Sequence, residues 1–237
     1  MKIAVSWSSG KDSAWTLHVL RRQHPGCTEG LLTTINEAFD RVAMHAVRRE
    51  LVTAQAHAVG LRLYAIDLPW PCANDTYEAR MAAAVRQLES DGFTHIAFGD
   101  LFLEDVRRYR EDRLAATGLT PLFPLWKATT TRELAEEMIE SGLRACLTCV
   151  DPRVLPSSFA GRSFDRGLLA DFPAGVDPCG ENGEFHSFVW DGPMFSQPVA
   201  AAVGERVERD GFVFADVVPL QAGARLDGCS LTTRLTQ

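Results

Sequence analysis

The sequence predicts an α/β protein built on a mainly parallel sheet with helices on both faces. Through the first 126 residues, short apolar stretches such as Ile3–Trp7 alternate with longer stretches whose apolar residues recur at helical spacing. Strands that alternate with helices are typical of parallel sheets, because each connecting helix packs against one face of the sheet. After residue 126 the alternation stops, which predicts a smaller α+β domain over residues 127–237.

Each element of the first domain, residues 1–126, is bounded by residues that break regular structure. Residues 24–26 (His-Pro-Gly) stop the first helix, Gly60 ends the second, and residues 69–71 (Pro-Trp-Pro) close the third strand. Asn74 or Asp75 is a candidate N-cap of the third helix. We expect strands at residues 3–7, 28–35, 61–68, 94–98 and 122–125, and helices at residues 11–22, 44–59, 75–90 and 104–117.

The second domain is less regular. Residues 151–183 are rich in Pro, Gly, Ser and Asp, which favours a long loop region, and Gly142 is suited to end a preceding helix. We expect a helix at residues 131–141, strands at residues 144–150, 184–190 and 211–218, and one short helix near residues 162–170.

Composition narrows the possible partners. The chain of 237 residues has a formal net charge of −7, whereas nucleic-acid binders usually carry a basic excess, so nucleic acid is an unlikely partner. No apolar stretch approaches the roughly 20 residues of a membrane span. The apolar start of the chain gives way to Gly10-Lys11-Asp12 too early for a signal peptide. We therefore expect a cytoplasmic protein without membrane contact.

Residues 8–13 (Ser-Ser-Gly-Lys-Asp-Ser) separate the first strand from the first helix, and this position favours phosphate binding. A helix that starts beyond the carboxyl end of a parallel strand offers unpaired N–H groups and the positive end of its dipole. Gly10 lets the backbone approach an anion, Lys11 adds positive charge, and Asp12 fits a Mg²⁺ ligand or a group that fixes the loop. The residues expected to hold a nucleotide here are Ser8, Ser9, Gly10, Lys11, Asp12 and Ser13.

This loop is not the Walker loop, because that motif needs a glycine at position 5, where Val5 stands. Residues 8–13 instead resemble the PP-loop of the N-type ATP pyrophosphatases, written SGGxDS, with Ser9 in place of the first glycine. The resemblance implies that ATP is attacked at its α-phosphorus, so that AMP is transferred and pyrophosphate leaves.

Further motifs follow in order along the chain. They are Gly99-Asp100-Leu101, the arginines within residues 107–113, Pro124-Leu125-Trp126, and Cys179-Gly180-Glu181-Asn182-Gly183-Glu184-Phe185-His186-Ser187-Phe188. This succession resembles, over about residues 3–193, the diphthine–ammonia ligase family, which amidates the modified histidine of translation elongation factor 2. The family's downstream signature is close to GEGGEF-H/E-T, and here Asn182 replaces a glycine and Ser187 a threonine.

The resemblance implies a HUP-type, Rossmann-like nucleotide domain, a C-terminal domain that completes the substrate pocket, and possible homodimer formation. The expected reaction adenylates a substrate carboxylate with ATP and Mg²⁺, and ammonia then displaces AMP to give an amide. Diphthamide belongs to archaea and eukaryotes. The high Arg and Ala content favours a bacterial source, in which the acceptor would be a different carboxylate, such as a cofactor precursor or small metabolite.

Specific roles follow for the acidic loop, residues 180–184. Glu184 is expected to act as the base for ammonia or to position it, and Glu181 to bind ammonium or Mg²⁺. His186 is expected to hold substrate or transfer a proton. Asp100, at the end of a strand, is a second candidate Mg²⁺ ligand beside Asp12. At the end of the second strand, the residues expected to face adenine or ribose are Thr33, Thr34 and Ile35.

Two other functions remain open. A PP-loop enzyme that thiolates tRNA could use the CxxC of Cys146 and Cys149 with Cys179, although residues i and i+3 of a strand point to opposite faces. A non-catalytic sensor could bind ATP or AMP without turnover. The cysteines are expected to be reduced thiols that pack in the core rather than a disulfide framework. They are Cys27, Cys72, Cys146, Cys149, Cys179 and Cys229.

Overall fold

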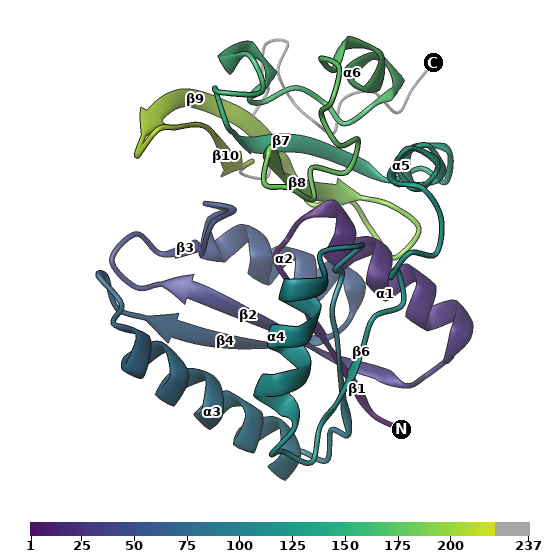
Figure 1. Cartoon of the computed structure of the whole chain (residues 1–237), viewed down its shortest axis with the longest axis vertical. Coiled ribbons are helices and arrows are strands. Elements are labelled where there is room, and N and C mark those ends of the chain that lie inside the picture. Colours follow the sequence, from purple (N-terminus) through teal and green to yellow (C-terminus); the bar gives the residue numbers. More distant parts are fainter. Residues whose placement is uncertain (221–237) are drawn as a thin grey trace.

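The computed structural model describes residues 1–220, and within them the first sheet has six strands. Its strand order is β3-β2-β1-β5-β6, and β4 pairs with β2 on the side away from β1 (Figure 1). All of these pairs are parallel except the short β2–β3 pair. The strands are β1 Ile3–Ser6, β2 Thr28–Asn36, β3 Arg41–Val42, β4 Arg62–Leu68, β5 His95–Ala97 and β6 Thr120–Leu122.

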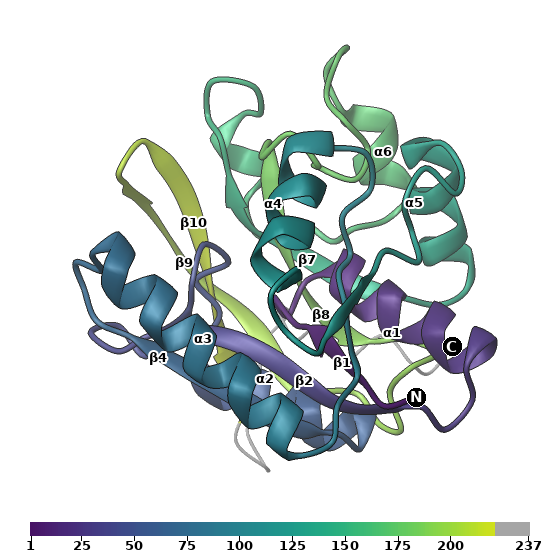
Figure 2. The ribbon, with the colours of Figure 1, turned by 60° about the horizontal axis from the view of Figure 1, so that its bottom comes forward.

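Helices cover both faces of this sheet, as the alternating pattern predicts. The side chains of β1 alternate between two buried clusters: Ile3 and Val5 join the cluster that holds α1 and α2, and Ala4 joins the cluster that holds α3 and α4. Figure 2 brings α3 forward over β2 and β4. The helices are α1 Lys11–Gln23, α2 Arg49–Val59, α3 Asn74–Ser90 and α4 Glu104–Leu114.

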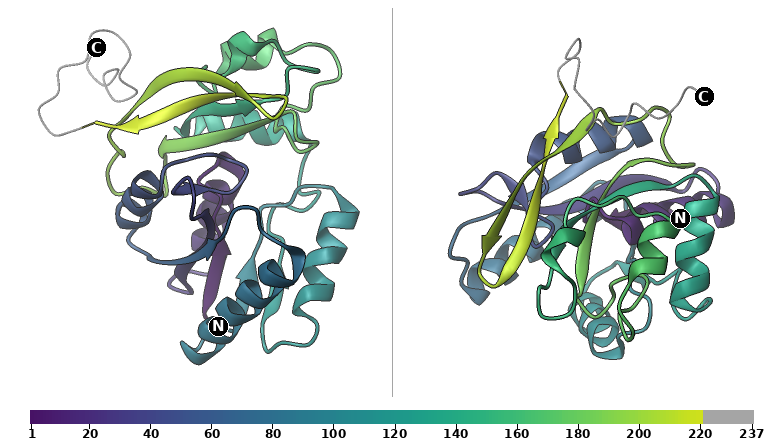
Figure 3. Two further views of the ribbon diagram at one scale, coloured as in Figure 1. Left: turned by 90° about the vertical axis from the view of Figure 1, so that its left-hand side faces the viewer. Right: turned by 90° about the horizontal axis from the view of Figure 1, so that it is seen from above.

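The second sheet is antiparallel, with the order β8-β7-β10-β9. It packs on the outer side of α1 and α2, so these two helices lie between the sheets and one buried cluster spans both (Figure 1). The left view of Figure 3 shows the β9–β10 hairpin above β3 and α2, where Arg41 and Arg48 pair with Asp216. The elements are α5 Thr131–Glu140, β7 Arg144–Val150, the 3₁₀ turn Ser157–Phe159, α6 Arg166–Asp171, β8 Phe185–Asp191, β9 Ala201–Arg209 and β10 Phe212–Pro219.

Several predicted boundaries are wrong. Helix α2 begins at Arg49 rather than at residue 44, because residues 41–47 form β3 and a tight turn. The N-cap of α3 is Ala73, with no side-chain capping bond, so neither Asn74 nor Asp75 caps it. Helix α4 ends at Leu114, and β6 spans Thr120–Leu122 instead of residues 122–125. Strand β6 starts early because Thr120 pairs with His95 of β5.

Strand β9 was missed by the sequence prediction, because most of its residues are exposed and four of them are charged. Asp210 and Gly211 both have positive φ, as the turn of a tight β-hairpin requires, and their Asp-Gly sequence is a signal for it. Among the described helices, none has the length and apolar character needed to cross a membrane.

Candidate active site

The loop of residues 8–13 lies at the carboxyl end of β1, and Gly10 is the N-cap of α1. A Cβ atom on Gly10 would come within 2.9 Å of the ring of His45, so a larger residue does not fit here. Ser9 has a φ of 70°, the left-handed conformation in which the PP-loop pattern carries a glycine. Its buried hydroxyl has no hydrogen-bond partner within the described residues.

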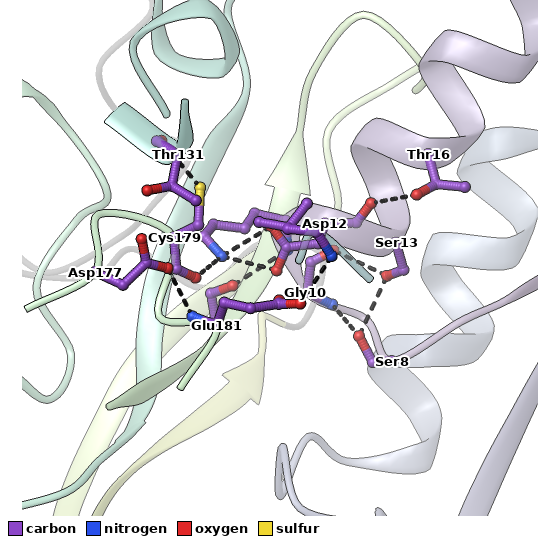
Figure 4. A network of polar contacts seen from close by, with 12 residues as sticks. Ser8, Gly10, Asp12, Ser13, Thr16, Thr131, Asp177, Cys179 and Glu181 are labelled. Atoms are coloured by element: carbon purple, nitrogen blue, oxygen red, sulfur yellow. Dashed lines mark hydrogen bonds and ion pairs between the residues drawn. The ribbon is translucent and has the colours of Figure 1, made fainter. Parts of the chain in front are cut away.

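Lys11 is the buried cation of the site, with 2% of its surface exposed. Its Nζ donates to both carboxylate oxygens of Asp12, at 2.9 and 2.7 Å, and to the carbonyl of Cys179. Burial opposes the charge, but Asp12, Cys179 and Glu181 outweigh it and raise the pKa of Lys11 above its ordinary value. Figure 4 shows Asp12, Cys179 and Glu181 at the centre of this polar network.

Strand β8 of the second sheet holds the loop in shape. The backbone N–H of Lys11 donates to Ser187 Oγ at 3.1 Å, and the N–H of Val189 donates to the carbonyl of Ser9 at 3.0 Å. Gln55 of α2 donates to the carbonyls of both Ser9 and Val189. The loop of residues 8–13 is therefore shaped by residues from both halves of the chain.

A cavity of about 270 Å³ opens between this loop and the acidic loop. It contains nine of the residues expected at the site, namely Ser8, Lys11, Asp12, Ser13, Asp100, Gly180, Glu181, Gly183 and His186. The lining also includes His45 and Phe98, which sequence reasoning missed, and Arg110, which belongs to the arginines of residues 107–113 but was assigned no role. No local motif marks His45, and the sequence does not single out Arg110 from the neighbouring arginines, because only the fold brings these two side chains to the cavity. The other expected residues do not line it: Ser9, Gly10, Thr33, Thr34, Ile35, Asn182 and Glu184.

Three carboxylates crowd one side of the cavity. Glu181 Oε1 accepts the N–H of Leu101 at 2.7 Å, yet burial together with Asp12 and Asp100 raises the pKa of Glu181 to about 7. Burial also raises the pKa of Asp100, against the lowering effect of Arg110. Asp100 Oδ2 and Arg110 Nε are 3.6 Å apart, and neither atom has a hydrogen-bond partner in the described part of the chain. Unsatisfied buried groups of this kind are suited to contact a ligand.

Glu184 points into its own loop instead of into the cavity. Its carboxylate accepts the backbone N–H groups of Asp177 and Asn182 and the side-chain amide of Asn182, each at 3.0 Å. Asp177 in turn accepts the N–H of Glu181 at 2.8 Å. The structure thus gives Glu184 the contacts of a positioning residue, and it places Glu181 at the cavity.

Two histidines, His45 and His186, also line the cavity. The rings of His45 and His186 have centroids 4.5 Å apart. Burial and the nearby charge of Lys11 lower the pKa of His186 to about 4. Burial, His186 and Lys11 likewise lower the pKa of His45 well below its ordinary value, although a bond to Ser187 opposes the shift. Both rings are therefore neutral near pH 7.

A second hollow of about 810 Å³ lies between α3 and α4 against the sheet. Its lining is mainly apolar, with Leu32, Tyr77, Met81 and Val85 among its residues. It shares three lining residues with the first cavity: Ser6, Phe98 and Arg110. The two hollows therefore adjoin at the carboxyl ends of β1 and β5.

Neither CxxC cysteine lines this cavity, although Cys149 pairs across the β7–β8 ladder with His186, which does. Cys146 and Cys149 are buried on β7, and burial raises the pKa of each thiol to about 12. Within residues 1–220, no group of three or more His, Cys, Asp or Glu side chains is arranged to hold a metal by itself. Five cysteines in this part of the chain are free thiols, and Cys229 lies outside the described residues.

Comparison with known proteins identifies the family. The profile of the diphthamide synthase N-terminal domain matches residues 1–120, and that of the diphthamide synthase C-terminal domain matches residues 130–215. A diphthine–ammonia ligase of Danio rerio is 28% identical over 238 residues, covering 92% of this chain and 92% of the relative. Those of Bos taurus and Homo sapiens are each 25% identical over 245 residues, covering 93% of this chain and 90% of the relative. Two domain profiles in the expected order, with relatives aligned along nearly the whole chain, agree with the resemblance found in its motifs: the chain belongs to the diphthamide synthase family.

Proposed function

We propose that this protein is an ATP-dependent ligase that adenylates a carboxylate, releases pyrophosphate and transfers ammonia to form an amide. The observation that carries the proposal is the meeting of Lys11, Asp12 and Glu181 in one cavity at the start of α1. The names of the relatives, diphthine–ammonia ligase, support ammonia as the second substrate. The acceptor is diphthine or another carboxylate.

The two adjoining hollows support a divided nucleotide site. The small polar cavity suits the phosphates, because Lys11 and the hydroxyls of Ser8 and Ser13 line it. The larger apolar hollow suits adenosine, with Leu32 one residue before the Thr33–Ile35 segment expected to face the base. The α-phosphate would then lie at the junction, beside the unsatisfied Arg110. This arrangement favours attack at the α-phosphorus and loss of pyrophosphate.

Asp12 and Asp100 are the residues that would hold Mg²⁺. Mg²⁺ is commonly bound by one or two carboxylates together with substrate phosphates, and Asp100 Oδ2, which has no hydrogen bond within residues 1–220, fits that donor set. When bound, the ion would neutralise charge that develops on the leaving pyrophosphate. Lys11 provides fixed positive charge in the same place, since its side chain is held by Asp12 and Cys179.

The amide-forming step needs neutral ammonia near the acyl group. A carboxylate oxygen of the acceptor attacks the α-phosphorus, and the bond to the pyrophosphate oxygen breaks. Ammonia then attacks the acyl carbon, AMP leaves with the electron pair of the broken C–O bond, and a base removes one proton from the nitrogen. Glu181 is the candidate base, because its pKa of about 7 matches this task. Glu184 keeps the loop of Glu181 in place.

We treat residues 1–126 as the nucleotide-binding domain and residues 127–237 as the domain that completes the site. The thiolation alternative has less support, because Cys146 and Cys149 are buried and neither lines the cavity. The sensor alternative leaves the three carboxylates around the cavity without a task.

The test incubates the purified protein with Mg²⁺, ATP, ammonium and a carboxylate-rich metabolite extract or diphthine-bearing elongation factor 2, and then separates the nucleotides. AMP with pyrophosphate, dependent on the acceptor and absent in Asp12→Asn, is the expected result. ADP with phosphate would overturn the α-phosphate chemistry. Nucleotide that binds without turnover under every acceptor would favour the sensor.

A further inference from the structure

A strained turn holds His45 against the loop of residues 8–13. Met44 and Ala46, on either side of it, have φ values of 62° and 56°, which non-glycine residues rarely adopt. Each such residue costs roughly 1 kcal/mol or more, so the surrounding structure must fix the turn. The backbone N–H of Ala46 donates to the carbonyl of Val42, and the Arg41 guanidinium donates to the carbonyl of Ala46 at 2.7 Å. Strain of this kind is typical of segments that hold a functional group in place.

The ring of His45 faces the small cavity that would hold the phosphates. It lines the small cavity beside Lys11, and it lies so close to Gly10 that a Cβ atom there would come within 2.9 Å of it. His186 approaches it from β8, with a ring centroid distance of 4.5 Å. The two rings thus come from opposite halves of the fold and meet over the loop of residues 8–13.

The hydrogen bonding of His45 limits what its ring can offer. Nδ1 lies 3.2 Å from the carbonyl oxygen of Ser187, and because a carbonyl only accepts, Nδ1 carries the proton in this contact. In the neutral ring the other nitrogen, Nε2, is then an acceptor. It repels a phosphate oxygen unless the ring gains a second proton.

We propose that His45 and His186 together bind the phosphate chain of the nucleotide, and the pyrophosphate that leaves, and that they take up a proton when this anion binds. The identity of the anion rests on the proposed function. The histidine pair would then be a polyphosphate contact in addition to Lys11 and the loop of residues 8–13.

The charges around the pair explain why uptake is coupled to binding. Without an anion, burial, the ring of His186 and the charge of Lys11 on α1 all oppose a positive charge on His45, and together they hold its pKa well below the ordinary value. A polyphosphate reverses the sign of the local field and favours the charged rings. The other ionisable groups that line the cavity are Asp12 on α1, Asp100 after β5, Arg110 on α4, and Cys179 and Glu181 on the acidic loop.

Glu181 is the group that could imitate this effect, since a bound anion would also favour its protonated form. The experiment must therefore separate the histidines from Glu181. Titration calorimetry with inorganic pyrophosphate, without Mg²⁺, is run at pH 6.5 in Pipes and in imidazole, two buffers with different ionisation enthalpies. The difference between the two observed enthalpies, divided by the difference between the two ionisation enthalpies, gives the net number of protons taken up on binding.

We expect uptake of about one proton per site in the wild-type protein. His45→Asn keeps a donor for Ser187, and His186→Gln keeps a polar side chain of similar length. Each is expected to lose most of the uptake and to bind pyrophosphate about tenfold more weakly at pH 6.5, with a smaller loss at pH 8.5. Glu181→Gln is expected to keep the uptake. The matched control is His57→Asn, on the exposed side of α2, which should behave as wild type.

Uptake that persists in both histidine variants, or that disappears in Glu181→Gln alone, would overturn the proposal. So would pyrophosphate binding without proton exchange, or no pyrophosphate binding. Thermal unfolding of each variant checks that it is folded. Because His45→Asn and His186→Gln are independent, the test survives if one of them fails to fold. The proposed function has its own readout, the nucleotide products. If ATP yields ADP, but the proton uptake on pyrophosphate binding is lost in the histidine variants, the ligase assignment fails and the anion site stands.

Discussion

Lys11 and Cys179 are joined by a hydrogen bond although 168 positions separate them, because the ammonium of Lys11 donates to the carbonyl oxygen of Cys179. This contact joins the loop at the start of α1 to the residue that directly precedes the acidic loop. The same ammonium also bonds Asp12, so one buried cation organises both loops. Nucleotide binding and the geometry of Glu181 are therefore expected to depend on the same residue.

Replacement of Lys11 by Gln should reduce kcat/KM for ATP by at least about 100-fold, because it removes a buried charge aimed at the phosphates. It also leaves Asp12 without its cation. The measurement is steady-state AMP formation. Lys127→Gln is the control, because Lys127 is exposed and pairs with Glu104 outside the small cavity. A Lys11→Gln enzyme with ordinary turnover would contradict the assigned role.

The sequence was sufficient for the parallel sheet and the loop of residues 8–13, because both depend on local signals. The periodicity of β1 and α1 and the Ser-Gly-Lys-Asp order are visible along the chain. It was not sufficient to find His45 or to single out Arg110 among its neighbouring arginines, because their positions arise from a strained turn and from the packing of α4 against β6. The roles of Glu181 and Glu184 could not be separated either, since only three-dimensional contacts reveal which carboxylate turns into its own loop.

Glu181→Gln and Glu184→Gln should fail in different ways. Glu181→Gln keeps its contact with the Leu101 N–H but loses a base, so ATP binding should remain while amide formation falls about 100-fold or more. Glu184→Gln turns an NH₂ group toward a backbone N–H donor, which should lower the free energy of unfolding by about 1–3 kcal/mol. Thermal unfolding with ATP binding and amide assays separates the two. Equal loss of stability in both variants would show that the carboxylates share one structural role.

The pH dependence of amide formation should report on Glu181. A base acts when unprotonated, and the pKa of this carboxyl is raised to about 7, so the rate should rise as the pH passes through 7. Free ammonia must be held constant across the series, because ammonium itself loses its proton as the pH rises. Glu181→Gln should flatten the profile. A profile that is already flat in the wild-type protein would exclude Glu181 as the base.

The same raised pKa has a consequence for stability. The folded protein binds a proton at Glu181 more tightly than the unfolded chain does. The contribution of Glu181 to the free energy of unfolding is therefore present at low pH and is lost as the pH rises from about 4.5 to about 7. At pH 8 the buried charge is a cost, which Gln removes. Allowing for the partial exposure of this side chain, Glu181→Gln should stabilise the nucleotide-free protein by about 1 kcal/mol at pH 8 and by little at pH 4.5. Denaturant unfolding at the two pH values is the measurement, and stabilisation at pH 4.5 alone would reverse the assigned sign.

Ser9→Gly should stabilise the protein by about 1 kcal/mol. Ser9 holds a φ of 70° and a buried hydroxyl without a partner in the described part of the chain, and glycine removes both penalties. The added freedom of glycine in the unfolded chain offsets part of this gain.

Ser8→Gly is the matched control: Ser8 Oγ contacts Ser13 Oγ at 3.3 Å and the N–H of Gly10 at 3.4 Å, so the change should destabilise the protein. Denaturant unfolding without nucleotide measures both. If Ser9→Gly is less stable than wild type but binds ATP normally, the Ser9 hydroxyl has a structural partner, such as an ordered water. If only ATP affinity falls, the hydroxyl binds phosphate, and the serine is kept for the ligand at the expense of the fold.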